Sequence, residues 1–372
     1  MALSSTIQSA LQRHQTAIQE AMRNAFMKVQ AAASTDTATN NLQALYGQIQ
    51  YHLGWVSADF VPTRSNPGKL LRPTLLLLAY EASGAWGLTE SKAYLQRALP
   101  AAAALELTHN FTLIHDDIED GDAERRHRPT LWKSWGIPQA INTGDGLFAL
   151  SRLVLWDVLA EGVESDIAVR LGALLDRTCL VIAEGQYLDI SFENRQDISV
   201  AMYLDMISRK TAALMACAAE MGARLGTRDV ETIGRLHDFG NAMGIAFQVR
   251  DDLLGVWATT TELGKTPAGD VYRRKKSLPI LHALENANTQ DQQHLRTIYQ
   301  QEAPISKEQV AAILATFERT HTQVFCRAFL AEQCHLAYEA LASVPYASNP
   351  QAAQAIEDMN LMVHFVEETV KE

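Results

Sequence analysis

Residues 99–128 read LPAAAALELTHNFTLIHDDIEDGDAERRHR, an apolar run that ends in an acidic cluster and then a basic one. Their periodicity predicts one helix over residues 99–120. On that helix Asp116 and Asp120 lie one turn apart on the same face, together with His109 and Thr112. Like charges at this spacing destabilise a helix by about 0.2–0.5 kcal/mol unless a cation neutralises them. The stretch therefore indicates a cation site, with a solvated acidic helix end as the alternative.

A second acidic pair, Asp251 and Asp252, ends another apolar helix, which also carries Gln248. The position one turn beyond Asp251 is Gly255, so this face has no further carboxylate and predicts a weaker metal site. Aspartate at a helix C-terminus is unfavourable to the helix dipole unless it is compensated. That favours a metal or a basic partner over the alternative, an ordinary helix end.

Cationic side chains follow both acidic clusters. Arg125 and Arg126 come after the first, while Lys265 and the RRKK run at residues 273–276 come after the second. Carboxylates bind Mg²⁺ through oxygen, and guanidinium and ammonium groups bind the phosphate oxygens that the metal leaves free. The combination therefore predicts a Mg²⁺–diphosphate site.

A further basic pair, Lys69 and Arg72, lies between Gly68 and Pro73. In the first turn of a helix these two cations share a face and can bind one phosphate group. Because a lysine at a helix N-terminus opposes the dipole, its presence there again indicates an anion. Two solvated cations are the alternative.

Bulk composition excludes several classes of protein. The chain has 372 residues, is 47% hydrophobic and carries a net charge of −11, which argues against a general nucleic-acid or anionic-membrane surface. Its apolar runs are too short to span a bilayer, and no signal-peptide pattern is evident. The four cysteines lack CxxC spacing, so we expect reduced thiols in a cytoplasmic protein.

Helical periodicity dominates the chain and convincing period-2 strands are absent, which predicts an all-α fold. No linker composition or internal repeat is apparent, so we expect a single domain over residues 1–372. Within it we expect N-terminal helices in residues 1–50, a motif-bearing core at about residues 54–284 and C-terminal helices in residues 290–372. A capping box at Ser306 and Gln309 and an N-cap with proline at Asn349-Pro350 predict two helix starts.

Together these motifs resemble the trans-isoprenyl diphosphate synthase (polyprenyl synthetase) family, most closely its bacterial short-chain geranylgeranyl diphosphate synthases. The resemblance implies the isoprenoid synthase fold, a bundle of long helices around a central cavity, commonly a homodimer. The ordered motifs are Gly68-Lys69…Arg72-Pro73, Glu106–His109 leading into Asp116–Asp120, Arg125-Arg126, Gly185-Gln186…Asp189, Lys210-Thr211, Phe247-Gln248…Asp251-Asp252, Gly264-Lys265 and Lys275…Leu278-Pro279.

The resemblance also implies a role for each matching residue. Asp116 and Asp120 match ligands of two Mg²⁺ ions, and Asp251 matches the ligand of a third. Residues that match the allylic diphosphate site are Arg125, Lys210, Gln248 and Lys265, with Thr211 and Lys275 as further substrate-binding positions. Residues that match the isopentenyl diphosphate site are Lys69, Arg72, His109 and Arg126. The implied catalytic set is Asp116, Asp120, Arg125, Lys210, Asp251 and Lys265.

The implied activity is a Mg²⁺-dependent condensation of isopentenyl diphosphate with an allylic diphosphate. Ionisation of the allylic diphosphate gives a cation that the alkene attacks, and an apolar cavity keeps water away. Phe111 and Thr112, just before the first acidic motif, correspond to the family's chain-length positions and suggest a C20 product, with C15 or C25 open. Gly255 departs from the family pattern, in which many members carry aspartate.

Two other functions fit parts of the pattern. A class I terpene cyclase would keep the metal motifs but need no isopentenyl diphosphate site, so the matches at Lys69, Arg72, His109 and Arg126 argue against it. A regulatory subunit of a heteromeric synthase would be expected to lose acidic ligands, and this chain retains its main ones.

Overall fold

The helix predicted over residues 99–120 is α4, Leu99–Glu119, in the computed structural model of the chain. The structure describes residues 5–33, 39–63, 68–84, 92–258, 268–345 and 349–371. The α-helices are α1 Ser5–Ala33, α2 Thr39–His52, α3 Leu71–Ala82, α4, α5 Leu131–Trp135, α6 Ile137–Trp156, α7 Ser165–Phe192, α8 Val200–Ile207, α9 Ala213–Gly226, α10 Val230–Trp257, α12 Gly269–Tyr272, α13 Leu278–Asn286, α14 Thr289–Gln300, α15 Lys307–Arg319, α16 Thr322–Ala342 and α17 Pro350–Lys371.

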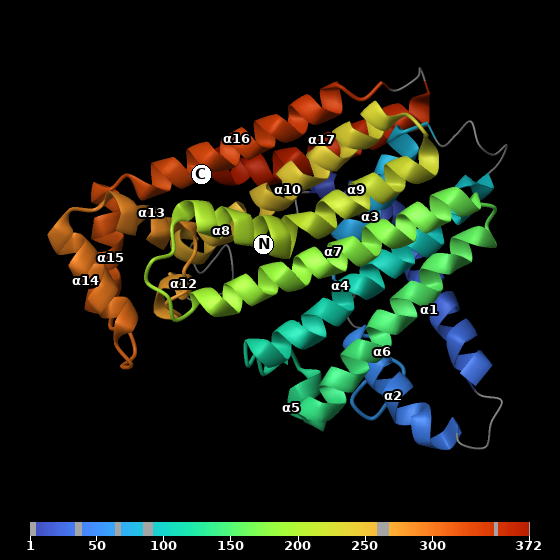
Figure 1. Cartoon of the computed structure of the whole chain (residues 1–372), viewed down its shortest axis with the longest axis horizontal. Coiled ribbons are helices and arrows are strands. Elements are labelled where there is room, and N and C mark those ends of the chain that lie inside the picture. Colours follow the sequence, from blue (N-terminus) through green and yellow to red (C-terminus); the bar gives the residue numbers. More distant parts are fainter. Residues whose placement is uncertain are drawn as a thin grey trace.

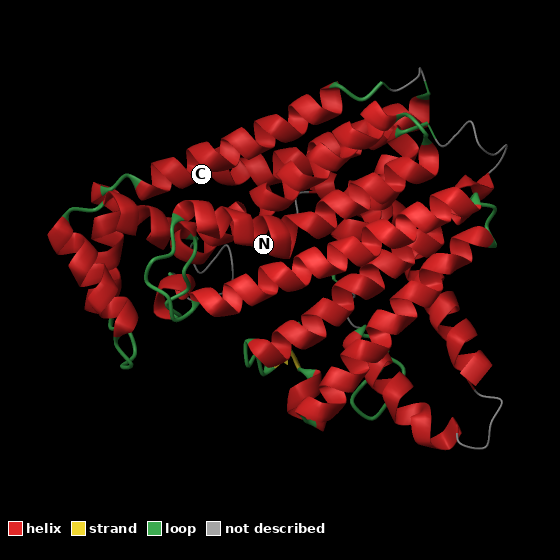
Figure 2. Ribbon diagram, in the orientation of Figure 1, coloured by secondary structure: helices red, strands yellow, loops and turns green. Residues whose placement is uncertain are grey.

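Shorter elements join these helices. They are the 3₁₀ helices η2 Lys92–Arg97 and η3 Asp157–Leu159, and the π-helical turn η4 Ser208–Ala212. The two-residue strands β1 Glu124–Arg125 and β2 Arg128–Pro129 form an antiparallel hairpin. Helices make up nearly all of the described chain, so the predicted all-α class is confirmed (Figure 2).

The long helices run side by side as a slanting bundle, with α14 and α15 at one end and α2 and α5 below it (Figure 1). The core runs through the middle of this bundle. Residues 101–105 of α4 and 75–78 of α3 are fully buried there. Glycines bring the backbones close, since a Cβ at Gly222 of α9 would lie 2.1 Å from the Leu76 carbonyl oxygen of α3.

Both predicted helix starts are present. Ser306 Oγ accepts a hydrogen bond from the Gln309 backbone N–H at 3.3 Å, and Gln309 Oε1 accepts one from the Ser306 backbone N–H at 3.0 Å. Asn349 Oδ1 accepts from the Gln351 N–H at 3.0 Å at the start of α17. Each bond satisfies a backbone donor that the first helical turn leaves unpaired.

The prediction that Lys69 and Arg72 share a first helical turn is wrong. Helix α3 begins at Leu71, after Leu70 adopts a left-handed conformation with φ of 49°. Leu70 is buried, and its burial holds a conformation that otherwise costs about 1–2 kcal/mol. The reversed backbone places Lys69 ahead of the helix instead of on its face.

The remaining bulk predictions concern cysteines and membrane spans. All four cysteines are free thiols, as predicted. Among the helices of the described segments, none has the length and hydrophobicity needed to cross a bilayer.

Candidate active site

Asp116, near the C-terminal end of α4, is approached by two cations. Arg125 Nη2 lies 3.4 Å from its Oδ2 and Lys210 Nζ lies 3.3 Å from its Oδ1. One turn further, partial burial and the Asp116 charge raise the pKa of Asp120 to about 6. The predicted acidic face is therefore formed, and its negative charge is already balanced in part by cations from two other segments.

The β1–β2 hairpin carries the cations that follow this face. Its two turn residues, Arg126 and His127, have φ of 53° and 61°. Positive φ at both central residues is typical of the type I′ turn, which matches the twist of short hairpins. Arg125 is anchored by its Nε, which donates at 2.6 Å to the buried Asp117 carboxylate. The hairpin thus fixes Arg125 over the acidic face while Arg126 projects elsewhere.

Arg126 meets the Lys69–Arg72 segment. Gly68, with φ of 91°, packs on Arg126 so closely that a Cβ would lie 2.9 Å from its Nη2. Arg72 Nη1 donates to His109 Nε2 at 3.1 Å. Burial and the nearby Arg72 hold the pKa of His109 well below its usual value, so His109 is neutral and can accept this bond. Three predicted anion-binding side chains, Arg72, His109 and Arg126, thus come together.

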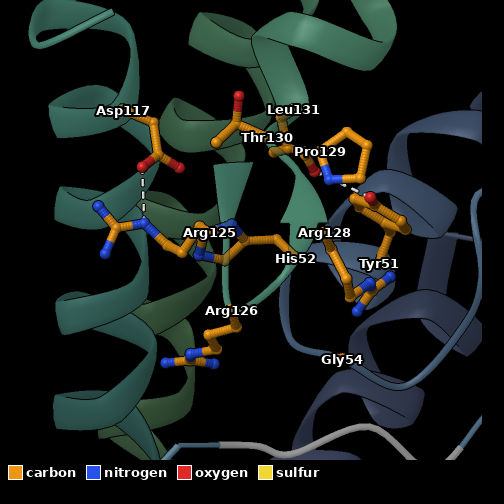
Figure 3. A pocket seen from close by; sticks show the side chains of 10 residues that line it. All are labelled: Tyr51, His52, Gly54, Asp117, Arg125, Arg126, Arg128, Pro129, Thr130 and Leu131. Atoms are coloured by element: carbon orange, nitrogen blue, oxygen red, sulfur yellow. Dashed lines mark hydrogen bonds and ion pairs between the residues drawn. The ribbon is translucent and has the colours of Figure 1, made fainter. Parts of the chain in front are cut away.

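Sequence reasoning missed His52, which lies beside this group at the end of α2. It lines a small pocket with the three hairpin arginines Arg125, Arg126 and Arg128. Figure 3 shows Arg125 directed toward Asp117 and Arg128 toward Tyr51. Burial and the arginines lower the pKa of His52 to about 3, and its Nε2 has no hydrogen-bond partner among the described residues. A lone histidine at a helix end gave no signal for this position.

Lys210 and Thr211 lie in the π-helical turn η4, an irregularity common at functional sites. Helix α7 crosses this turn at Gly185, where a Cβ would lie 2.4 Å from the Lys210 backbone nitrogen. Lys210 Nζ also pairs with Asp189 at 2.6 Å. Burial disfavours its charged form, but Asp189 and Asp116 outweigh burial and raise the pKa of Lys210. Asp189, recognised in the sequence as part of a motif but without a role, is therefore the residue that pairs with Lys210 together with Asp116.

The two residues of the second acidic pair, Asp251 and Asp252, differ in their exposure to solvent. The Asp251 side chain is 63% exposed, whereas that of Asp252 is 0% exposed. Asp252 accepts hydrogen bonds from Tyr203 Oη, from the Leu278 N–H at 3.2 Å and from Gln248 Nε2 at 3.1 Å. Its oxygens are thus already occupied, and Asp251 is the carboxylate of the pair that remains exposed.

Helix α12 supplies a carboxylate where α10 lacks one. A Cβ at Gly255 would lie 2.2 Å from Asp270 Oδ2, so the Asp270 carboxylate fills the space one turn beyond Asp251. Lys275 Nζ lies 3.7 Å from Asp270 and 3.5 Å from Asp252. No role was assigned to Asp270 from the sequence.

A cavity of about 610 Å³ runs from the acidic face between α4, α6, α7 and η4. Phe111 and Thr112 both line it. The Phe111 ring meets Phe148 of α6 edge to face, with centroids 5.0 Å apart. Thr112 turns its hydroxyl back to the His109 carbonyl at 2.7 Å. A mostly apolar cavity therefore adjoins the charged acidic face and has an aromatic pair in its wall.

The structure places all but one of the predicted site residues. Lys265 lies outside the described residues. Thr211 donates to Gln248 Oε1 at 3.1 Å, which joins η4 to α10 at the mouth. Lys69 lies near Asp251 and Arg250, and burial lowers its pKa. The predicted residues of α4, η4, α10 and the hairpin thus surround one mouth.

The carboxylates fit Mg²⁺ held together with diphosphate. Nowhere in the described segments do three His, Cys, Asp or Glu side chains converge closely enough to cage a metal by themselves. Mg²⁺ is usually held by one or two carboxylates, several waters and substrate phosphates, which is what Asp116, Asp120 and Asp251 offer beside the cations. The donors are all oxygens, as this hard cation requires.

Comparison with known proteins agrees with this geometry. The polyprenyl synthetase family model matches residues 55–317. Geranylgeranyl diphosphate synthase of Mycobacterium tuberculosis is 39% identical over 260 residues, 70% of this chain and 71% of the relative. Polyprenyl synthetase from Streptomyces coelicolor A3(2) superposes with a TM-score of 0.78 at 34% identity, over 94% of this chain and 99% of that one.

A second similar structure contains ligands. Polyprenyl synthase from Caulobacter crescentus CB15, complexed with calcium and isoprenyl diphosphate, has a TM-score of 0.71 at 26% identity and covers 97% of each chain. Family match, relatives and fold agree with one another and with the arrangement of carboxylates, cations and cavity. The chain belongs to the polyprenyl synthetase family of Mg²⁺-dependent prenyltransferases.

Proposed function

We propose that this protein condenses isopentenyl diphosphate with an allylic diphosphate and makes a short-chain all-trans prenyl diphosphate, with C20 as its main product. One observation carries the proposal: two separate cationic groups meet at the acidic mouth of a single apolar cavity. The group formed by Arg125 and Lys210 suits the diphosphate that leaves. The group formed by Lys69, Arg72 and Arg126 suits the diphosphate that anchors the attacking alkene.

The allylic diphosphate is assigned to the acidic face. Asp116, Asp120 and Asp251 would hold Mg²⁺, which supplies charge stabilisation to the departing diphosphate. The side chains that would bind its remaining oxygens are Arg125, Lys210, Thr211, Gln248, Lys265 and Lys275. Neutral His109 with Lys69, Arg72 and Arg126 would hold isopentenyl diphosphate alongside.

The reaction follows from this placement. The allylic C–O bond breaks with its electron pair going to the diphosphate oxygen, and the isopentenyl double bond attacks the cation to form a C–C bond. The attack through the terminal alkene carbon leaves a tertiary cation on C3 of the isopentenyl unit. A proton is then lost from C2, the neighbouring carbon on the diphosphate side, and its C–H electron pair forms the new C2–C3 double bond; the released diphosphate is a suitable base. Holding both substrates at one mouth replaces a bimolecular encounter, and the apolar walls exclude water from the cation.

Catalysis tests this proposal directly. With Mg²⁺, isopentenyl diphosphate and each of the C5, C10 and C15 allylic primers, we expect linear all-trans diphosphates that end mainly at C20. Chromatography of the dephosphorylated products measures their length. Absence of isopentenyl incorporation at saturating substrate would contradict the proposal, and a cyclic hydrocarbon formed from a prenyl diphosphate alone would favour the terpene cyclase.

We further propose three Mg²⁺ ions, with Asp270 completing the third site beside Asp251. The support is steric, because the Asp270 carboxylate occupies the place that a side chain at Gly255 would take. The second acidic motif is then divided between α10 and α12. The weaker site expected from Gly255 is thereby compensated by a residue fifteen positions later in the chain.

Moving the carboxylate between the two elements tests this division. Asp270→Ala is expected to weaken Mg²⁺-dependent binding of inorganic diphosphate about tenfold or more, the range for supporting residues of metal sites. Asp270→Ala with Gly255→Asp should recover most of that affinity in isothermal titration. Asp238→Asn, an exposed carboxylate on α10, is the control. Unchanged affinity in Asp270→Ala would show that Asp270 only packs on Gly255.

The assembly is proposed to be a homodimer in the cytoplasm, with each chain folded as one domain. Exposed large apolar side chains gather on α6 and α7, including Leu153, Trp156, Val169 and Tyr187, and such surfaces mark interaction sites. One continuous apolar core links residues from Leu11 to Val366, which supports a single domain. Four free thiols suit a reducing compartment.

A further inference from the structure

One part of the cavity wall combines aromatic and polar side chains. On α4, Phe111 lies five residues before Asp116, which at 1.5 Å per residue is about 7.5 Å along the helix. The lining also includes Phe148, whose ring meets that of Phe111, together with Asp176 and Cys179. An apolar tail that grows away from the diphosphate mouth therefore meets an aromatic pair with polar groups around it.

Phe148 needs support to act as a barrier. Its side chain is 38% exposed, so packing alone leaves the ring room to move. Arg152, one turn further along α6, places its guanidinium carbon 4.6 Å from the centre of the Phe148 ring. A cation over an aromatic face is attracted to the ring, and more strongly when it is shielded from water. The Arg152 side chain is only 16% exposed.

Arg152 is itself held from three sides. Its Nη2 donates to Cys179 Sγ at 2.8 Å, its Nη1 donates to Thr108 Oγ1 at 3.4 Å, and its Nε lies 2.6 Å from Asp176 Oδ1. These partners belong to α4 and α7, while Arg152 belongs to α6. The guanidinium therefore connects the three helices that enclose the cavity, directly behind the aromatic pair.

We propose that Arg152 is a positioning residue that limits product length by fixing Phe148 in the wall of the cavity. A longer tail must displace the Phe148 ring, and the ring cannot move without breaking its contact with a guanidinium that three partners hold in place. The tail would also bring apolar groups against a largely buried charge, which is unfavourable. This inference rests on the proposed chain-elongation activity.

A purely structural role predicts something different. If Arg152 only tied three helices together, its loss would lower stability and the amount of active enzyme but leave the ratio of products unchanged. If it fixes the barrier, its loss changes that ratio whatever fraction of the enzyme is active. Product ratio is therefore the decisive measurement.

Arg152→Leu removes the charge while keeping an apolar side chain of moderate size. The Asp176 side chain that it leaves is 64% exposed and can be hydrated, so we expect the variant to fold. With excess isopentenyl diphosphate, the ratio of the next longer product to the wild-type main product should rise about tenfold, which corresponds to about 1.4 kcal/mol. Phe148→Ala should shift the ratio in the same direction.

Two further variants complete the test. Arg152→Gln can still donate hydrogen bonds to Thr108 and Cys179 but places no cation over the Phe148 ring, so it should also lengthen the products. It keeps the test possible if the leucine variant fails to fold. Arg177→Leu removes an exposed arginine of α7 and should leave the profile unchanged. A wild-type product ratio in folded Arg152→Leu or Arg152→Gln overturns the inference. Failure of the wild-type enzyme to elongate at all would instead overturn the proposed function.

Discussion

Replacement of Asp116 by asparagine is expected to lower turnover about a thousandfold or more while the protein stays folded. The carboxylate would hold Mg²⁺ against the departing diphosphate, and metal stabilisation of that charge is worth several kcal/mol, at about 1.4 kcal/mol for each tenfold in rate. The cost to folding is small, because the Asp116 side chain is 23% exposed and its two cationic partners lie at 3.3 and 3.4 Å. Partly exposed ion pairs of this kind contribute about 0–1 kcal/mol.

The measurement pairs steady-state turnover with unfolding in urea. Asp122→Asn is the matched control, since Asp122 belongs to the same acidic segment, is exposed and has no assigned role. The control should keep both activity and stability. Turnover of Asp116→Asn within tenfold of wild type would refute the metal assignment, and a large loss of folding free energy would show that the residue supports the fold instead.

Replacement of Asp252 by alanine is expected to lower the free energy of unfolding by about 3–5 kcal/mol. This carboxylate is fully buried and accepts from Tyr203 Oη, Gln248 and the Leu278 N–H, with Lys275 at 3.5 Å. Alanine leaves these donors without an acceptor inside the protein. Each buried unpaired donor costs about 1–3 kcal/mol, so the loss exceeds that of a typical substitution.

The neighbouring residue provides the control for stability. Asp251→Ala removes a side chain that is 63% exposed and should change the urea midpoint little, although it should reduce catalysis. The two substitutions should therefore have different effects: Asp251→Ala should lower mainly turnover, and Asp252→Ala should lower mainly the free energy of unfolding. Equal stability losses for the two variants would contradict this division.

Local features of the site were predictable from sequence because they depend on helix geometry alone. The face formed by Asp116 and Asp120 follows from a spacing of four residues on α4, and the capping box at Ser306 follows from a local hydrogen-bond pattern. The resemblance to a family supplied the roles of residues that lie far apart in the chain. Periodicity by itself could not have predicted that Arg72 and Arg126 lie close together.

The parts that sequence reasoning missed depend on contacts between distant segments. Asp270 replaces the carboxylate missing at Gly255 only because α12 packs against α10. His52 lies among three arginines only because the hairpin folds over the end of α2. The start of α3 was misjudged because Leu70 takes a left-handed conformation, which a buried leucine adopts only when tertiary packing demands it.

Lys210 and Arg125 flank Asp116, so its carboxylate is already paired with two internal cations. Under the proposed assignment, Mg²⁺ arriving alone would compete with these two counterions, and diphosphate arriving alone would have to draw them away from the carboxylate. When both arrive, the cations would pair with phosphate and the carboxylate with metal. Substrate loading would then be an exchange of ionic partners, in which we expect each ligand to raise the affinity for the other.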